Sequence, residues 1–255
     1  MSVPAWPFVL ALLGAVIGSF LNVVADRIPD DQSLVSPRSY CPACKRQLHP
    51  LELIPIVSYL ALRGRCRTCG ARIPLRVFGV EVASGLVFGL AAVRFGLSLH
   101  TALVCLFSAL LIVFFVIDLE HGLVPNRLLF PSMGLAIFAI PFAPWEDPLG
   151  QLVGGVLSFG VLFAIAHLAA GGMGMGDVKL AALLGVILGF PAIVPGLLVA
   201  FISGGAVAGG LLLAGRIERR DPMPFGPFLS AAGVLFLLYG DQIVHWWLGG
   251  GALWS

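Results

Sequence analysis

The chain has 255 residues, of which 59% are hydrophobic and only 11% are charged. A soluble globular protein of this composition would have too few polar side chains to cover its surface, so the composition indicates an integral membrane protein. The net charge is +2, which gives no indication of nucleic-acid binding.

Long apolar stretches predict an all-α membrane protein of about eight transmembrane helices, because a helix needs about 20 apolar residues to cross a bilayer. The first is predicted at residues 4–25. It has no basic residue before its apolar run and no clear small-residue cleavage site, so we expect a retained helix rather than a secretory signal. The others are predicted at residues 78–97, 101–117, 123–142, 149–169, 178–190, 194–214 and 225–248, and the one at 178–190 is short.

The basic residues lie almost entirely on one side of this predicted topology. Of 15 Lys and Arg, nine fall in residues 27–76 and only Arg94 lies on the opposite side. The positive-inside rule therefore places residues 26–77 in the cytoplasm and both chain ends outside. The remaining five are in alternate loops on the cytoplasmic side, at Arg127, Lys179, Arg216, Arg219 and Arg220.

Three segments are expected: the first helix within residues 1–25, a polar loop at residues 26–77, and a seven-helix domain at residues 78–255. Many glycines lie inside the apolar helices, where small residues let neighbouring backbones approach closely. We predict that packing role for Gly154, Gly155, Gly204, Gly205, Gly209 and Gly210.

The polar loop contains two CxxC pairs separated by 21 residues, Cys41 with Cys44 and Cys66 with Cys69. Two such turns complete the tetrahedral shell of four thiolates that a structural Zn²⁺ ion prefers. A loop of this size buries little core, so the metal would supply much of its folding free energy. The sequence therefore predicts a structural zinc site.

Two disulfides or unpaired thiols are the alternative for these cysteines, although disulfides do not persist in the reducing cytoplasm. His49 is close enough in sequence to compete as a metal ligand. Cys105 lies within a predicted helix and is interpreted as an ordinary small apolar residue.

Two aspartates lie at predicted membrane edges on the cytoplasmic side. Asp118 ends an apolar run, and Asp177 follows Gly174-Met-Gly176 at the start of another. An ionisable group at the edge of the hydrocarbon indicates function. Two neighbouring carboxyl groups retain one proton between them, so that one activates water while the other protonates the carbonyl oxygen or leaving amine of a peptide bond. We therefore predict that Asp118 and Asp177 form the catalytic pair of an intramembrane aspartyl protease.

Simpler roles are open for the same residues. Asp177 could be a helix N-cap and Asp118 a solvated boundary residue, and Glu120 or His121 could replace Asp118 in catalysis. Lys179 is expected to extend toward the headgroups. The two glycines before Asp177 are expected to adopt backbone angles closed to other residues, which would unwind the chain and admit an extended substrate.

Five segments, in order along nearly the whole chain, resemble the motifs of the type IV prepilin peptidases, also called bifunctional leader peptidase and N-methyltransferase enzymes. The sequence departs from the pattern at Glu120 and Asn126, where the family often has Asp. The segments are residues 18–29, the double CxxC with residues 62–66 between the pairs, residues 118–126, residues 172–180 with a GxGD motif, and residues 224–228.

The resemblance implies Asp118 and Asp177 as catalytic residues, and Cys41, Cys44, Cys66 and Cys69 as zinc ligands. It implies cleavage of prepilins or pseudopilins of pili, type II secretion or competence systems at the cytoplasmic face of the bacterial inner membrane. The cut follows a glycine after a short basic leader. Methylation of the new N-terminus by S-adenosylmethionine is implied by the resemblance alone, because no glycine-rich nucleotide loop follows a predicted strand.

Two other classes of function remain open from the residues. Another GxGD protease, such as a preflagellin or signal-peptide peptidase, would lack the zinc loop and the signature from Gly18 to Asn22. A non-catalytic membrane scaffold or transporter would use its intramembrane carboxylates to bind ions, and changing them would leave leader peptides cut.

Overall fold

A computed structural model describes residues 4–168, 173–218 and 223–248. These residues are almost entirely helical, and the only β-pairing among them is two isolated bridges, which confirms the predicted all-α class. The chain divides into two compact units, residues 1–113 and residues 114–255. The helices are α1 (Trp6–Arg27), η1 (Pro50–Leu53), α2 (Val57–Ala61), α3 (Leu75–Phe95), α4 (Leu99–His121), α5 (Asn126–Ala139), η2 (Ile140–Phe142), α6 (Pro148–Leu168), α7 (Met175–Leu188), α8 (Ile193–Leu213) and α9 (Gly226–Trp247).

Each predicted transmembrane helix has a counterpart in the described part of the chain. There, six helices are long and apolar enough to cross a membrane: α1, α3, α4, α6, α8 and α9. The other two counterparts are shorter. One is α5 with η2, which together cover residues 126–142, and the other is α7, which has 14 residues.

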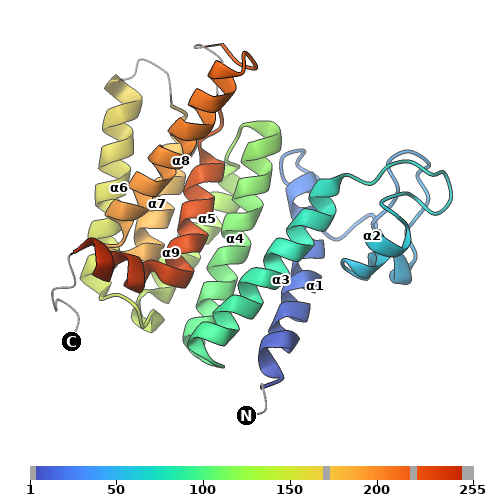
Figure 1. Ribbon diagram of the computed structural model, residues 1–255, viewed down its shortest axis with the longest axis horizontal. Coiled ribbons are helices and arrows are strands. Elements are labelled where there is room, and N and C mark those ends of the chain that lie inside the picture. Colours follow the sequence, from blue (N-terminus) through green and yellow to red (C-terminus); the bar gives the residue numbers. More distant parts are fainter. Residues whose placement is uncertain (1–3, 169–172, 219–222, 249–255) are drawn as a thin grey trace. The chain divides into compact units, whose positions relative to one another are not determined.

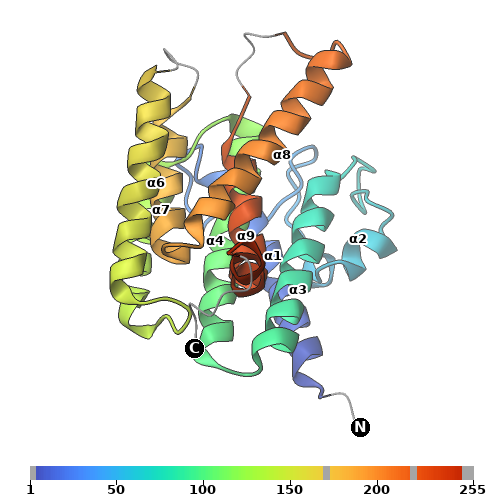
Figure 2. The same ribbon diagram turned by 60° about the vertical axis from the view of Figure 1, so that its left-hand side comes forward.

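In the first unit, α1 and α3 pack side by side through small residues on α1 (Figures 1 and 2). A Cβ atom at Gly14 would lie 2.5 Å from the carbonyl oxygen of Ser84, and one at Gly18 would lie 2.8 Å from Cα of Glu81. Such distances are far below van der Waals contact, so only glycine lets the two backbones approach this closely. This contact gives a structural reason for Gly18 in the N-terminal signature.

Two polar residues of the same signature hold the start of the polar loop. The buried amide of Asn22 donates to the carbonyl oxygens of Gly18 and Val77, at 3.1 Å each. The buried guanidinium of Arg27 donates to the carbonyl oxygens of Ser33 at 2.7 Å and Pro37 at 2.6 Å. Arg27 satisfies backbone groups just after α1, and Asn22 links α1 to the first turn of α3, so the signature has a structural role.

In the second unit, α6 and α7 pack closely because of glycines. A Cβ at Gly154 would lie 2.5 Å from the carbonyl oxygen of Gly185, and one at Gly155 would lie 2.6 Å from a methyl group of Val186. Gly204 is also a packing residue, against Phe228 of α9 at 3.3 Å. The prediction is wrong for Gly205, Gly209 and Gly210 of α8, because a Cβ atom added at any of them would meet no atom of another helix within 4 Å in the described part of the chain.

The C-terminal end of α7 is held by the short segment between η2 and α6 together with the first turn of α6. The indole N–H of Trp145 donates to the carbonyl oxygen of Ile187 at 2.9 Å, and the N–H of Phe190 donates to the carbonyl oxygen of Gly150 at 2.9 Å. The first bond satisfies one of the four carbonyls that a helix leaves unpaired at its C-terminus. The helix then stops at Gly189, whose φ of +74° favours glycine.

Glu146, in the same segment and outside the membrane-spanning helices, is packed against Gly150 and Gly189. Burial of the charged form and repulsion by Asp147 raise its pKa from 4.5 to about 7. The folded protein therefore binds the Glu146 proton more tightly than the unfolded chain, and stability should fall by about 1–2 kcal/mol, after allowance for solvent screening, as the pH rises through this window.

Thermal unfolding of the wild type and of Glu146→Gln in detergent, at about pH 5 and about pH 8, tests this expectation. The wild type should lose more stability than the variant between the two pH values. An equal loss in both proteins would contradict it.

Candidate active site

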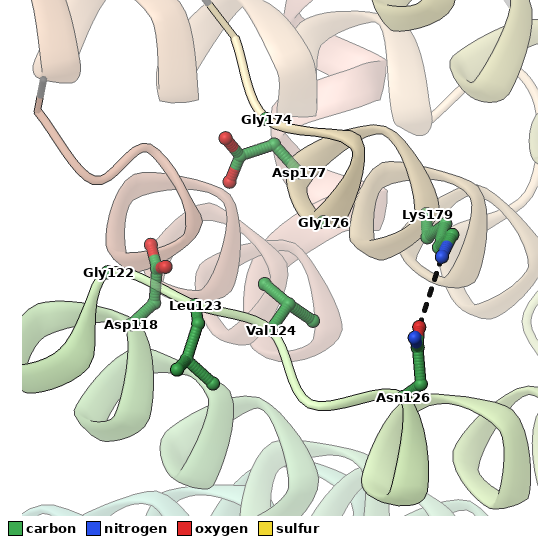
Figure 3. A pocket seen from close by; sticks show the side chains of 9 residues that line it. All are labelled: Asp118, Gly122, Leu123, Val124, Asn126, Gly174, Gly176, Asp177 and Lys179. Carbon is green, nitrogen blue, oxygen red and sulfur yellow. Dashed lines mark hydrogen bonds between the residues drawn. The ribbon is translucent and has the colours of Figure 1, made fainter. Parts of the chain in front are cut away.

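A pocket of about 280 Å³ lies where the C-terminal end of α4, the turn into α5 and the N-terminal end of α7 meet (Figure 3). All of these elements belong to the second unit. The pocket contains both predicted catalytic aspartates. It is lined by Asp118, Gly122, Leu123, Val124, Asn126, Gly174, Gly176, Asp177 and Lys179.

Asp118 lies in the last turn of α4 with only 3% of its surface exposed. The helix ends three residues later, at His121. The next residue, Gly122, has a φ of +63°, and its N–H donates to the carbonyl oxygen of Asp118 at 2.9 Å. A Cβ at Gly226, the first residue of α9, would lie 2.6 Å from Oδ2 of Asp118. The absence of a side chain at Gly226 therefore makes the space that this carboxyl group occupies.

Asp177 lies in the first turn of α7 and is half-buried. The N-cap of this helix is Gly174, with no side-chain hydrogen bond, so the interpretation of Asp177 as the N-cap is wrong. A carboxylate in the first turn is favoured by the positive end of the helix dipole. The position also directs the side chain back toward the turn that precedes the helix.

The two glycines of the GxGD motif act differently from the expectation. Gly174 has an ordinary φ of −73°, and Gly176 lies within α7, so neither unwinds the chain through angles reserved for glycine. Gly176 instead provides space: a Cβ there would lie 3.1 Å from Cβ of Val124. Its lack of a side chain lets the start of α7 lie directly against the turn after α4.

The carboxyl groups of Asp118 and Asp177 point into the same space (Figure 3). The sequence predicted this convergence for residues 59 positions apart. Two carboxyl groups in one partly buried pocket disfavour the state in which both are charged. The arrangement is therefore able to accept a proton from water and to donate one to a leaving group.

At the other end of the pocket, the ammonium of Lys179 donates to Oδ1 of Asn126 at 3.1 Å and lies 5.7 Å from the ring centre of Phe130. Lys179 links α7 to the start of α5 and lines the pocket. Asn126, where the resembling family often has Asp, here accepts from that lysine.

The four predicted zinc ligands lie together in the first unit. The four Sγ atoms are all within 4.8 Å of one another, and those of Cys41 and Cys69 are 3.8 Å apart. Tetrahedral coordination with Zn–S distances of about 2.3 Å requires sulfur atoms about 3.8 Å apart. All five cysteines are free thiols, which argues against the disulfide alternative. Cys105 is buried in α4, as expected for a small apolar residue.

The two CxxC turns have similar backbones. The N–H of Cys41 donates to the carbonyl oxygen of Arg46 at 2.9 Å, and that of Cys66 donates to the carbonyl oxygen of Ala71 at 2.8 Å. Backbone N–H groups of Cys69 and Thr68 lower the pKa of the Cys66 thiol to about 6. This sulfur is therefore largely a thiolate at neutral pH, which is the form that binds a metal.

His49 has a different role from that of a metal ligand. Its Nδ1 accepts from the N–H of Leu51 at 3.3 Å and so caps η1. Glu52 accepts from the backbone N–H of His49 at 2.8 Å and pairs with both terminal nitrogens of Arg46, at 2.7 and 3.0 Å. The guanidinium holds the pKa of Glu52 at about 2, so this contact between the first CxxC turn and η1 persists throughout the physiological pH range.

Comparison with known proteins agrees with these two sites. The model of the bacterial peptidase A24 N-terminal domain matches residues 12–95, and the type IV leader peptidase family model matches residues 105–209. A prepilin leader peptidase/N-methyltransferase of Bacillus subtilis is 36% identical over 94% of this chain and 97% of its own length. The chain belongs to the type IV leader peptidase family.

Two further relatives are also prepilin leader peptidase/N-methyltransferases. The protein of Pseudomonas aeruginosa is 37% identical over 93% of this chain and 91% of its own length, and that of Stutzerimonas stutzeri is 36% identical over 91% and 90%. No solved structure matches the chain. As a leader peptidase of this family, the protein contains both domains that the family models describe.

The sequence alone did not predict that Gly226 lies against Asp118 of the candidate site. The segment Pro224-Phe-Gly-Pro227-Phe resembles a family motif. Its glycine at the start of an apolar helix is the feature that could have indicated a close contact there. Conversely, Glu120 and His121 are exposed and are not among the residues that line the pocket. Neither replaces Asp118 there.

Proposed function

We propose that this protein removes leader peptides from prepilins or pseudopilins by aspartate-catalysed hydrolysis and then methylates the new N-terminus. The observation that carries the proposal is the pairing of Asp118 and Asp177 in one pocket of a chain that belongs to the leader peptidase family. The relatives' shared name supplies both the substrate class and the second activity.

In the cleavage step, one carboxylate takes a proton from a water molecule as its oxygen attacks the carbonyl carbon of the scissile peptide bond. The other carboxyl group donates its proton as the C–N bond breaks and the amine leaves. The leader departs with a new carboxyl group and the pilin retains a new amine. A pocket of about 280 Å³ is at the small end for ligand sites, so it suits a short extended segment.

The site is proposed to face the cytoplasm of a bacterium, with both chain ends outside the plasma membrane. The positive-inside rule supports this orientation, because the topology predicted from the sequence puts Arg127 and Lys179 on the same side of the membrane as the basic polar loop. Lys179 lines the pocket. A prepilin whose basic leader remains in the cytoplasm would present its scissile bond at this membrane face.

Methyl transfer is carried over from the relatives' names. S-adenosylmethionine would supply the methyl group, which the lone pair of the neutral N-terminal amine attacks; the amine then releases a proton and S-adenosylhomocysteine leaves.

A mass measurement tests both activities together. Purified protein is incubated with a prepilin, with and without S-adenosylmethionine. We expect loss of the leader in both samples and an additional mass of one methyl group only with the methyl donor. Retention of the leader in both would reject the peptidase, and cleavage without methylation would reject the second activity alone.

The four-cysteine cluster is proposed to hold a structural Zn²⁺ ion, because four thiolates leave no open position for catalysis. We expect purified wild-type protein to contain about one zinc ion per chain, and a variant with Cys66→Ser and Cys69→Ser to contain almost none. Elemental analysis measures the difference. Equal zinc content in the two proteins would reject the four-thiolate site.

A further inference from the structure

The polar loop exposes a cluster of apolar side chains on η1 and α2. An unpartnered patch of this kind on an otherwise polar, charged domain indicates a surface that another phase or molecule covers. The patch consists of Leu51, Leu53, Ile54, Val57 and Leu60, which are 40–63% exposed.

The depth of this apolar patch relative to the membrane is set by contacts between α2 and α3. The ring of Tyr59 stacks on Phe78 with centroids 5.1 Å apart, and the N–H of Ile56 donates to a carboxylate oxygen of the buried Glu81 at 2.7 Å. Since α3 begins at Leu75, Glu81 lies only about 9 Å along it. Figures 1 and 2 show α2 beside this first part of α3.

The apolar patch faces away from the helix that supports it. Val57 and Leu60, three residues apart, share one face of α2, whereas Tyr59 is two positions from Val57 and lies on the opposite face. Tyr59 is the residue that contacts α3. The exposed face is therefore directed outward at the level where α3 enters the bilayer.

The polar loop is also strongly basic. Residues 26–77 contain nine Lys and Arg against four Asp and Glu, and of those four acids Asp26 and Glu52 already pair with Arg76 and Arg46. Such a surface attracts anionic lipid headgroups and repels a basic leader. The exposed bases are Arg38, Lys45, Arg63, Arg65, Arg67 and Arg72.

We propose that the apolar patch inserts into the boundary between headgroups and acyl chains of the membrane that the protein spans, while the surrounding bases bind anionic lipids. The combination of outward apolar side chains, shallow depth and basic charge is that of an interfacial anchor. The anchor attaches the four-cysteine loop to the membrane surface, independently of the peptidase reaction.

Photocrosslinking of the full-length, zinc-containing protein tests the proposal. Benzoylphenylalanine replaces Val57 or Leu60. The control position is Gln47, which is exposed and lies outside both CxxC pairs and outside the patch. In vesicles of phosphatidylcholine and phosphatidylglycerol, we expect lipid adducts at positions 57 and 60 and few at position 47. Adducts mainly to a second copy of the chain or to an added prepilin, or no lipid adducts, would overturn the proposal.

A second experiment measures how firmly the polar loop is attached. The double variant with Val57→Glu and Leu60→Glu should keep its zinc, because both side chains are exposed, but trypsin should cut after its exposed arginines several-fold faster than in the wild type. The wild type should likewise be cut faster in vesicles of phosphatidylcholine alone. Equal rates for the wild type, the double variant and a Gln47→Glu control would contradict the anchor.

Discussion

Replacing either Asp118 or Asp177 with Asn is expected to reduce leader removal by at least about a thousandfold. The amide has nearly the same size as the carboxyl group, so the pocket should keep its shape while losing the group that exchanges a proton with water or with the leaving amine. The expected loss is similar for both variants, because the proposed reaction needs one carboxyl group to accept a proton and the other to donate one. Leader removal from a purified prepilin, followed by mass, measures the effect.

Glu120→Gln is the matched control for this experiment. It makes the same chemical change in the last turn of α4, two residues after Asp118, at a side chain that is exposed and does not line the pocket. We expect nearly wild-type cleavage. Wild-type cleavage by Asp118→Asn or by Asp177→Asn would reject the catalytic pair, and a large loss in Glu120→Gln would show that the acid had been assigned to the wrong residue.

Replacing Gly226 with Ala is expected to reduce cleavage by about a hundredfold without unfolding the protein. The new Cβ would lie 2.6 Å from Oδ2 and 3.0 Å from Cγ of Asp118, so the carboxyl group must move. Its end is flexible enough to do so, and alanine is a better helix former than glycine, so stability should be unchanged or slightly higher. Activity and thermal unfolding are measured on the same preparation.

Gly240→Ala provides the comparison on the same helix. Its added Cβ would meet only Phe236, at 3.5 Å, which is ordinary van der Waals contact, so both activity and stability should stay close to those of the wild type. Full activity of Gly226→Ala would contradict the position of Asp118 against α9. Equal losses in both variants would indicate a general disturbance of α9 instead.

The helices were predictable from the sequence because each transmembrane segment must satisfy its own backbone and is therefore a local apolar run. The cysteine cluster was predictable because the spacing of the two CxxC pairs is typical of a zinc site. The convergence of two acids was predictable because the distribution of basic residues predicts that both lie on the same side of the membrane. Contacts between residues far apart in the sequence could not be predicted in this way. The role of Gly226 depends on α9 lying against the end of α4, and the role of Gly176 depends on Val124.

The short elements of the polar loop were also beyond sequence reasoning. The helix α2 has five residues, which is too short for a periodic pattern, and it is held by Tyr59 and by the Glu81 carboxylate rather than by its own propensity. The same limit explains the GxGD glycines. Glycines at these positions suggested unusual backbone angles. In the structure, Gly176 is instead needed for its small size, because it packs against Val124.

The length of α7 has a consequence for how water reaches the catalytic pair. Fourteen residues make a helix about 21 Å long, whereas the hydrocarbon layer is about 30 Å thick. If the end of α7 that Trp145 holds lies at one membrane surface, the Asp177 end would lie below the other surface. We therefore expect the proposed hydrolysis to take place in a recess below the headgroups, and the end of a substrate helix to unwind so that its peptide bond reaches water there.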